Sequence, residues 1–408
     1  MKNFTFKFLI FCIVLFSFDG FSQCGSGTLT LNSQQAVDEF VVNYPGCTVF
    51  TGSLQISGSD ISDLSPLSSI TSIVGGLRLS NNPSLTSIQG LHNITNIGGD
   101  LELNGFNFPL MNLNGLASLQ TVGGMLSVQS FLNLTSVQGL SNVTTVGGNF
   151  LIQFLGNTDF TSISLPNLTL VGRFNLRENN NLITVNFDGL ETVGTTFHLY
   201  SNDNLVTANF PALEEVGSSY INDFQIDSGL FEIFQGINLE NLNLSSLHTI
   251  KGGIDFVQNN ELMDLGFQNL TTVLRSIRIS SNPALTSIDG LSGLSGTLTN
   301  FSIIGTNISN LDALENITAI GSGTTGDLII NDNPQLTNVM GLSGITTINR
   351  NMEIHNNDVL VNLNGINALS SINYGYLSIQ DNAALAEING LQNLTAVGLL
   401  GNSNGISI

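Results

Sequence analysis

An internal repeat of about twenty-four residues constrains this 408-residue chain more than any other feature. In the repeat that starts at Leu77, an apolar residue or Asn recurs at Leu79 and Asn82 and then every third residue to Ile97. A glycine pair then precedes the next start, at Leu101. We call the first apolar residue of each repeat its anchor. The predicted anchors are Leu54, Leu77, Leu101, Leu126, Phe150, Phe174, Phe197, Phe224, Ile254, Ile277, Phe301, Leu328, Met352 and Leu377.

The spacing within the repeat excludes long amphipathic helices, because an apolar step of three drifts off one helical face. Strict alternation is brief, as in Leu77–Leu79 and Leu101–Leu103, and predicts very short strands. One turn of such strands cannot bury its apolar side alone, whereas stacked turns share a continuous core. The sequence therefore predicts an all-β solenoid, a parallel β-helix of about fourteen turns.

Two polar features recur at fixed places in the repeat. Glycine pairs, such as Gly98-Gly99 and Gly123-Gly124, predict a corner that needs either positive φ or close backbone packing. Asparagines five residues after the anchor predict a ladder of stacked amides; they are Asn82, Asn179, Asn202, Asn259, Asn282, Asn333, Asn357 and Asn382. A cation site beside this ladder, at Asp203, Asp332, Asp358 and Asp381, is the alternative. Where Phe106, Phe131 and Leu155 replace Asn, we expect an inward apolar stack, with an exposed binding stripe as the alternative.

The composition narrows the classes of partner. Lys and Arg total only 9 against 30 Asp and Glu, and the formal net charge is −21. Such a chain has few groups to neutralise phosphates, so nucleic acid is not an expected partner. No sequence motif for a cofactor or a metal ion is present, and neither is predicted.

The N-terminus predicts export. Residues 1–22 combine Lys2 and Lys7 with an apolar run and small residues before position 23, as in a secretory signal peptide. Cys24 and Cys47 remain after its removal, and an even pair in an exported chain predicts a disulfide. The predicted organisation is a signal peptide (1–22), a disulfide-bearing cap (23–53) and the repeats (54–408), with irregular turns near 217–253. No transmembrane segment is predicted in the mature chain.

The motif around Leu77-Arg78-Leu79-Ser80-Asn81-Asn82-Pro83-Ser84-Leu85 resembles leucine-rich-repeat sequence, except that two residues, not one, separate Asn82 from the next Leu. The chain is more similar to the receptor L-domain and to repeat-rich secreted proteins of Bacteroidetes type. The cap, in which the apolar stretch at 36–42 is expected to form a short helix, fits the same resemblance. It implies a right-handed solenoid and ligand binding at the cell exterior.

Catalytic chemistry finds little support in the residues. The best polar cluster combines Arg173 and Arg177 with Glu178, Glu191 and His198. We favour a solvated ion-pair face there, with a sugar-contacting face or a catalytic centre as alternatives. No catalytic residues are predicted, and the chain is not expected to be an enzyme.

Breaks in the repeat carry the remaining information, because insertions in solenoids map to loops. The longest break contains Tyr220, Phe224, Phe231 and Phe234, which are the candidate partner-binding residues. The predicted function is a non-catalytic extracellular binding or adhesion scaffold for a protein or glycan ligand. A structural spacer is the alternative, and a carbohydrate-active enzyme is less favoured.

Overall fold

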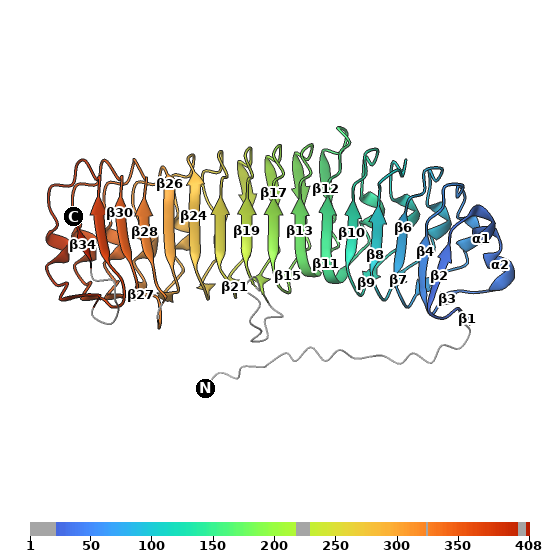
Figure 1. Cartoon of the computed structure of the whole chain (residues 1–408), viewed down its shortest axis with the longest axis horizontal. Coiled ribbons are helices and arrows are strands. Elements are labelled where there is room, and N and C mark those ends of the chain that lie inside the picture. The colour runs from blue at the N-terminus through green and yellow to red at the C-terminus, as the bar shows by residue number, and fades with distance from the viewer. Residues whose placement is uncertain (1–21, 218–228, 324, 399–404) are drawn as a thin grey trace.

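The computed structural model is a parallel β-solenoid of about 15 turns, with short helices only at its N-terminal end and in its corners (Figure 1). The structure describes residues 22–217, 229–323, 325–398 and 405–408. The predicted fold class is confirmed. The predicted signal peptide lies almost entirely outside the described residues.

The anchors begin one row of strands that runs the length of the rod, with every described neighbour parallel and in register. We call its outward side the strand face. The row consists of β2 (Thr28–Leu31), β4 (Ser53–Ile56), β6 (Leu77–Ser80), β8 (Leu101–Asn104), β10 (Leu126–Gln129), β11 (Thr145–Gln153), β13 (Leu170–Arg177), β16 (Phe197–Tyr200), β19 (Phe231–Phe234), β22 (Ile254–Val257), β24 (Ile277–Asn282), β26 (Phe301–Thr306), β28 (Leu328–Asn331), β30 (Met352–His355), β32 (Leu377–Gln380) and β34 (Ile406–Ser407).

A second row of shorter strands precedes each anchor, across the glycine corner. In β11 and β13 one long strand serves both rows. The others are β1 (Gln23–Cys24), β3 (Val49–Phe50), β5 (Ser72–Ile73), β7 (Asn96–Ile97), β9 (Thr121–Val122), β15 (Thr192–Val193), β18 (Glu215–Val216), β21 (Thr249–Ile250), β23 (Thr272–Val273), β25 (Gly296–Leu298), β27 (Ile317–Ile320), β29 (Thr347–Ile348), β31 (Ser371–Ile372) and β33 (Ala396–Val397).

The third side of the rod changes character along its length. Single 3-10 turns occupy it near both ends; they are η1 (Ser65–Leu67), η2 (Gln89–Leu91), η3 (Asn114–Leu116), η4 (Gln138–Leu140), η5 (Asp289–Leu291), η6 (Asp312–Leu314), η7 (Met340–Leu342), η8 (Asn364–Ile366) and η9 (Asn389–Leu391). The middle turns carry a four-stranded sheet instead, with β12 (Ser162–Ser164), β14 (Thr184–Asn186), β17 (Thr207–Asn209) and β20 (Asn241–Asn243).

The repeat sequence explains this switch. In seven of these nine 3-10 turns the middle residue is glycine, and at Gly90 an added Cβ would lie 1.8 Å from the Leu64 carbonyl oxygen of the turn below. The middle turns lack this glycine, and their buried residues alternate, as at Val185 and Phe187. Because alternation is the strand period, these segments form strands.

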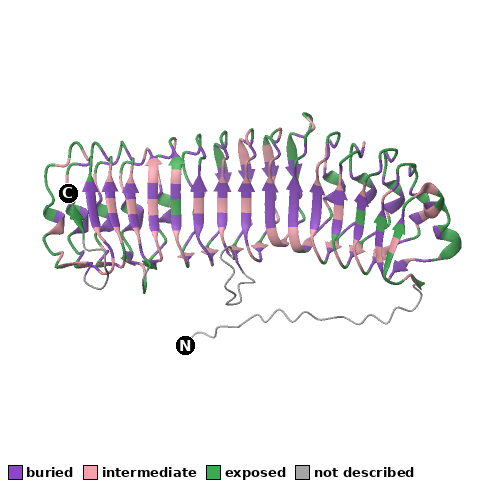
Figure 2. Cartoon of the chain, in the orientation of Figure 1, coloured by how far each residue is buried: buried purple, intermediate pink, exposed green. Residues whose placement is uncertain are grey.

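Side chains alternate between core and surface along the anchor row, as the purple and pale bands of its strands show (Figure 2). In the middle turns the anchors are phenylalanines that stack along the rod axis. Their ring centroids lie 5.5 Å apart for Phe150 and Phe174, 4.7 Å for Phe174 and Phe197, and 4.6 Å for Phe197 and Phe231. The predicted anchor Phe224 is wrong, because Phe231 pairs in register with Phe197.

The asparagine ladder is confirmed, and the structure explains its position. The residue before each ladder asparagine has a left-handed backbone, as at Asn81 (φ 51°) and Asn356 (φ 53°), which turns the chain out of the strand. Each buried asparagine then bonds to the turn below. Asn357, for example, donates from Nδ2 to the Ile330 carbonyl (2.8 Å) and accepts the Asn333 N–H at Oδ1 (3.2 Å).

Where the ladder lacks asparagine, the expectation of an inward stack is met only in part. Phe131 and Leu155 are buried, but Phe106 is exposed. Phe108 takes the inward place instead and packs against Phe131, with ring centroids 5.6 Å apart. Gly105 packs so closely on the Phe131 ring that a Cβ there would lie 2.3 Å from it.

The glycine pairs serve close packing, which decides between the two roles predicted for them. A Cβ on Gly98 would lie 2.3 Å from the Val74 carbonyl oxygen, and one on Gly123 would lie 2.2 Å from that of Gly98. Among the pair glycines of the described turns, none has positive φ. The corner therefore brings successive turns closer than any side chain allows.

The cap contains the predicted disulfide between Cys24 and Cys47, and the short helices α1 (Gln34–Asp38) and α2 (Phe40–Asn43) that cover the end of the core. The bridge closes a loop with a sequence separation of 23. Reduction should lower the stability of the cap by about 2 to 3 kcal/mol, through the regained freedom of the unfolded loop. Urea unfolding of the mature chain with and without reductant measures this, and an unchanged transition would contradict it.

Candidate functional site

A hollow of about 420 Å³ opens on the strand face over β11, β13, β16 and β19. Its lining comes from three registers of adjacent strands: the residue before the anchor, the first outward residue after it, and the second outward residue. The lining residues are Asn149, Leu151, Arg173, Asn175, Arg177, His198, Tyr200 and Glu232. A volume of this order is typical of small-molecule sites.

The floor of the hollow is buried, although it consists of outward positions of the strands. Leu151 is 8% exposed and Asn175, its register neighbour on β13, is 7% exposed. The equivalent Arg278, on β24, has 55% of its side chain exposed. The fold therefore holds a polar amide almost out of water on its outer face.

Several polar atoms around this floor have no hydrogen-bond partner. They are the Oδ1 atoms of Asn149 and Asn175 and the Nε of Arg173. A buried polar atom without a partner costs about 1 to 3 kcal/mol. Such atoms gathered around one hollow are typical of a site whose missing partners come from a ligand.

The basic residues of the hollow are also unusual in this acidic chain. In the part of the chain that the structure describes, Arg78, Lys251, Arg278 and Arg350 each pair with a carboxylate, whereas Arg173 and Arg177 do not. The Nε of Arg177 donates to the Gln153 side-chain oxygen at 2.9 Å. The predicted ion-pair face is therefore wrong for these two arginines.

His198 lies between the guanidinium group of Arg173 and the carboxylate of Glu232. The Nη2 of Arg173 lies 3.2 Å from His198 Nδ1, and His198 Nε2 lies 3.5 Å from the Glu232 carboxylate. Because a guanidinium can only donate, we assign the neutral tautomer with its proton on Nε2, facing Glu232. This arrangement fixes the Arg173 head while leaving its positive charge unneutralised by direct contact.

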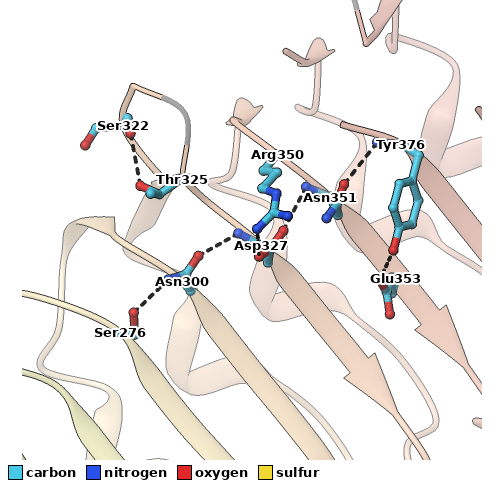
Figure 3. Close-up of polar contacts among 9 residues, drawn as sticks. All are labelled: Ser276, Asn300, Ser322, Thr325, Asp327, Arg350, Asn351, Glu353 and Tyr376. Atoms are coloured by element: carbon cyan, nitrogen blue, oxygen red, sulfur yellow. Dashed lines mark hydrogen bonds and ion pairs between the residues drawn. The ribbon is translucent and has the colours of Figure 1, made fainter. Parts of the chain in front are cut away.

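The C-terminal turns show how the residue before the anchor is satisfied when it has only a structural role. In Figure 3, Asn300 Oδ1 accepts the Asp327 N–H (2.9 Å), Asp327 Oδ1 accepts the Asn351 N–H (3.2 Å), and Asn351 Oδ1 accepts the Tyr376 N–H (3.3 Å). Asn149 occupies this same register position, yet its Oδ1 has no partner. In the C-terminal turns, the side-chain oxygen before the anchor thus accepts a backbone N–H from the next turn. The equivalent oxygen in the hollow makes no such bond.

A pH-dependent contact ends this C-terminal ladder. The Tyr376 hydroxyl donates to the Glu353 carboxylate, and this bond raises the pKa of Tyr376 to about 12 (Figure 3). Because the pKa in the folded protein exceeds the ordinary tyrosine value of 10.0, this contribution to stability is complete below pH 10 and disappears as the pH approaches 12. Phenolate absorbance should show a late-titrating group in the wild type that Tyr376→Phe removes and Glu353→Gln shifts downward. A tyrosine titration that is complete near pH 10 would contradict this.

Comparison with known proteins gives a family for the N-terminal turns. Residues 46–120 match the family model of the receptor L domain. This segment is similar to the receptor L domain. The matched segment ends before the hollow begins at Asn149, so the family match says nothing about the hollow itself.

A solved structure of an internalin from Listeria monocytogenes also matches this chain, with 13% identity, coverage of 92% of this chain and 86% of that one, and a TM-score of 0.26. At this TM-score the two backbones do not superpose over their whole length, and the match gives no information about the hollow. No curated protein matches the sequence.

The four predicted partner-binding residues do not form one cluster among the residues that the structure describes. Tyr220 and Phe224 lie outside the described residues. Phe231 is buried in the phenylalanine stack and contacts Phe197. Phe234 faces outward on β19 and stacks on Tyr200 of the hollow, with ring centroids 5.0 Å apart and 6° between the ring planes. The hollow residues other than Arg173, Arg177 and His198 escaped the sequence reasoning, although the run of polar residues at the outward positions of β13 was readable.

Within the described ranges, no group of three or more His, Cys, Asp and Glu side chains could hold a metal ion. The aspartates beside the ladder therefore form no such cluster there. Over the same ranges, the helices are too short and too polar to cross a membrane.

Proposed function

We propose that the protein is a non-catalytic extracellular binding module that recognises its ligand at the strand-face hollow over β11, β13, β16 and β19. One observation carries this proposal: the 7%-exposed Asn175 has an unpartnered Oδ1 in the hollow, beside the unpartnered Arg173 Nε. Both groups cost stability in the free protein, and a ligand that pairs with them would recover that cost.

Two features of the chain support a role outside the cell. A disulfide in the cap is typical of exported proteins, and the first 22 residues have the features of a secretory signal. The match of residues 46–120 to the receptor L domain supports a binding scaffold. A straight row of parallel strands also fixes side chains at defined spacings, which favours recognition by a rigid surface.

The test is a glycan and protein array probed with the mature chain and two variants. Asn175→Leu fills the floor of the hollow with the residue type that β11 carries at Leu151 and should abolish binding. Asn331→Leu makes the same exchange on the same face at β28, where the side-chain oxygen already accepts the His355 N–H, and should leave binding unchanged. Equal binding by all three proteins would contradict the proposal, and no binding by the wild type would favour the structural spacer.

A carbohydrate-active enzyme is a second candidate, and one specific observation favours it. Glu232 and Asp255 are register neighbours on β19 and β22, and hydrolysis of glycosides commonly uses two nearby carboxyl groups. Burial raises the pKa of Asp255, although Arg278, at 3.6 Å, opposes this. Each carboxylate, however, faces its own cationic or imidazole partner, and Asp255 lines a separate hollow. Release of reducing ends by the wild type, and its loss in Glu232→Gln, would establish this second function instead.

A further inference from the structure

We propose that the hollow binds an acidic saccharide, a sugar unit that carries both a carboxylate and free hydroxyls. This inference rests on the proposed function and names the ligand class of the same site. The ligand must supply an anion to the two arginines, hydroxyl donors to the two asparagine oxygens, and an apolar ring face to the neighbouring aromatic pair.

The cationic side of the hollow is suited to a carboxylate. Arg173 and Arg177 lie on the same strand, β13, and have no acidic partner within ion-pair distance among the described residues. Arg173 is held by His198 through Nη2, which leaves its buried Nε–H as an oriented donor. Planar guanidinium donors match carboxylate oxygens better than a lysine would.

The negative net charge of the chain does not prevent an anionic ligand from binding in the hollow. At physiological ionic strength, charges farther than about 8 Å are largely screened, so the local arrangement governs a short anionic ligand. Arg173 and Arg177 balance Glu178 and Glu232 near the hollow, whereas the chain as a whole carries −21. The hollow therefore does not share the strong acidity of the chain as a whole.

The acceptors beside the arginines select for hydroxyl groups. Asn149 Oδ1 and Asn175 Oδ1 are buried acceptors without donors, and a carboxylate or phosphate alone has no proton to give them. A simple anion would therefore satisfy the arginines and leave both amides unpaired. A sugar acid satisfies both kinds of group at once.

An aromatic platform completes the site. Tyr200 lines the hollow, and its ring stacks on Phe234 of β19, nearly parallel and 5.0 Å away. Both side chains are half-buried on the outward side of the row. The two rings are stacked face to face, so they present their apolar edges along two adjacent strands, and the C–H groups of a pyranose ring can pack against these edges. An extended acidic peptide has no equivalent rigid apolar face.

The experiment is calorimetric titration of the mature chain with oligogalacturonate, oligomannuronate and oligoglucuronate. The matched controls are the carboxyl-reduced forms of the same oligomers and a peptide of alternating Asp and Gly. At least one oligouronate should bind the wild type. Its reduced form should bind at least about tenfold more weakly, because charge-assisted hydrogen bonds to arginine are lost.

Two variants locate the binding. Arg173→Gln combined with Arg177→Gln keeps polar side chains of similar shape and should weaken oligouronate binding by at least about tenfold. Arg350→Gln, which removes an arginine that pairs with Asp327 in the corner before β30, should leave it unchanged. Circular dichroism of each variant verifies that the solenoid is folded.

The outcomes separate this inference from the proposed function. If a neutral glycan or a protein binds and Asn175→Leu abolishes that binding, the hollow is a site but the acidic-sugar inference is overturned. Binding of the acidic peptide alone, equal binding of the reduced oligomers, or full binding by the double variant overturns it as well. If no glycan or protein binds at all, the proposed function itself fails.

Discussion

Replacing Gly365 with alanine is expected to destabilise the solenoid by at least about 4 kcal/mol. Gly365 lies in η8, and an added Cβ would lie 1.8 Å from the Val339 carbonyl oxygen, 2.2 Å from its carbon and 2.5 Å from the Met340 nitrogen. All three are backbone atoms of the turn below, so no side-chain rotation relieves the clash. Either two turns separate or the 3-10 corner unfolds locally.

The control for this prediction is Gly156→Ala. Gly156 is also a corner glycine, but the nearest atom to its added Cβ is the flexible end of Leu132, at 2.9 Å. We expect a change in the free energy of unfolding within about 1 kcal/mol for this variant. Equilibrium urea denaturation followed by circular dichroism compares the two. If the two variants lost equal stability, close contact between turns would not be the reason for glycine at position 365.

Replacing Asn357 with leucine should have the second largest effect, a loss of about 3 to 5 kcal/mol. The side chain is fully buried and bridges two turns. Its Nδ2 donates to the Ile330 carbonyl and to Asn382 Oδ1, and its Oδ1 accepts from the backbone N–H of Asn333. Leucine has similar volume but leaves the Ile330 carbonyl and the Asn333 N–H buried without partners.

Asn367→Leu is the matched control, because Asn367 is exposed after η8 in the same turn. The same urea titration should place this variant within about 0.5 kcal/mol of the wild type. If Asn357→Leu were as stable as Asn367→Leu, the asparagine ladder would not contribute to the stability of the solenoid.

Much of the fold was predictable because every turn repeats the same physical problem. The anchors, the asparagine ladder and the glycine pairs each recur at a fixed offset, and stacking explains them together. The disulfide followed from the number of cysteines outside the predicted signal peptide. The middle turns also carried a readable signal, the alternation of Val185 and Phe187, which distinguishes strand from 3-10 turn.

Other features depended on contacts between turns and were not predictable from one repeat at a time. Phe231 and not Phe224 continues the phenylalanine stack, because the long insertion after β18 shifts the spacing from Phe197 to the next anchor. Phe108 replaces Phe106 in the core, because its ring packs against Phe131 of the next turn.

The hollow was the least predictable feature. Arg173, Arg177 and His198 were recognisable as a polar cluster, but sequence alone favoured ion pairs there. What distinguishes the hollow is the absence of partners for Asn149 Oδ1, Asn175 Oδ1 and Arg173 Nε, and this is a property of three adjacent strands in register. No single repeat contains it.

The central claim is that Asn175 is present for a ligand and not for the fold, and the free energy of unfolding of Asn175→Leu tests this most directly. Leu151 already occupies the equivalent position on β11, almost completely buried. In the absence of ligand, we predict that Asn175→Leu is as stable as the wild type or more stable by up to about 1 kcal/mol, because it removes an unsatisfied buried acceptor. A loss of more than about 2 kcal/mol would contradict the account, since it would show that the amide supports the solenoid.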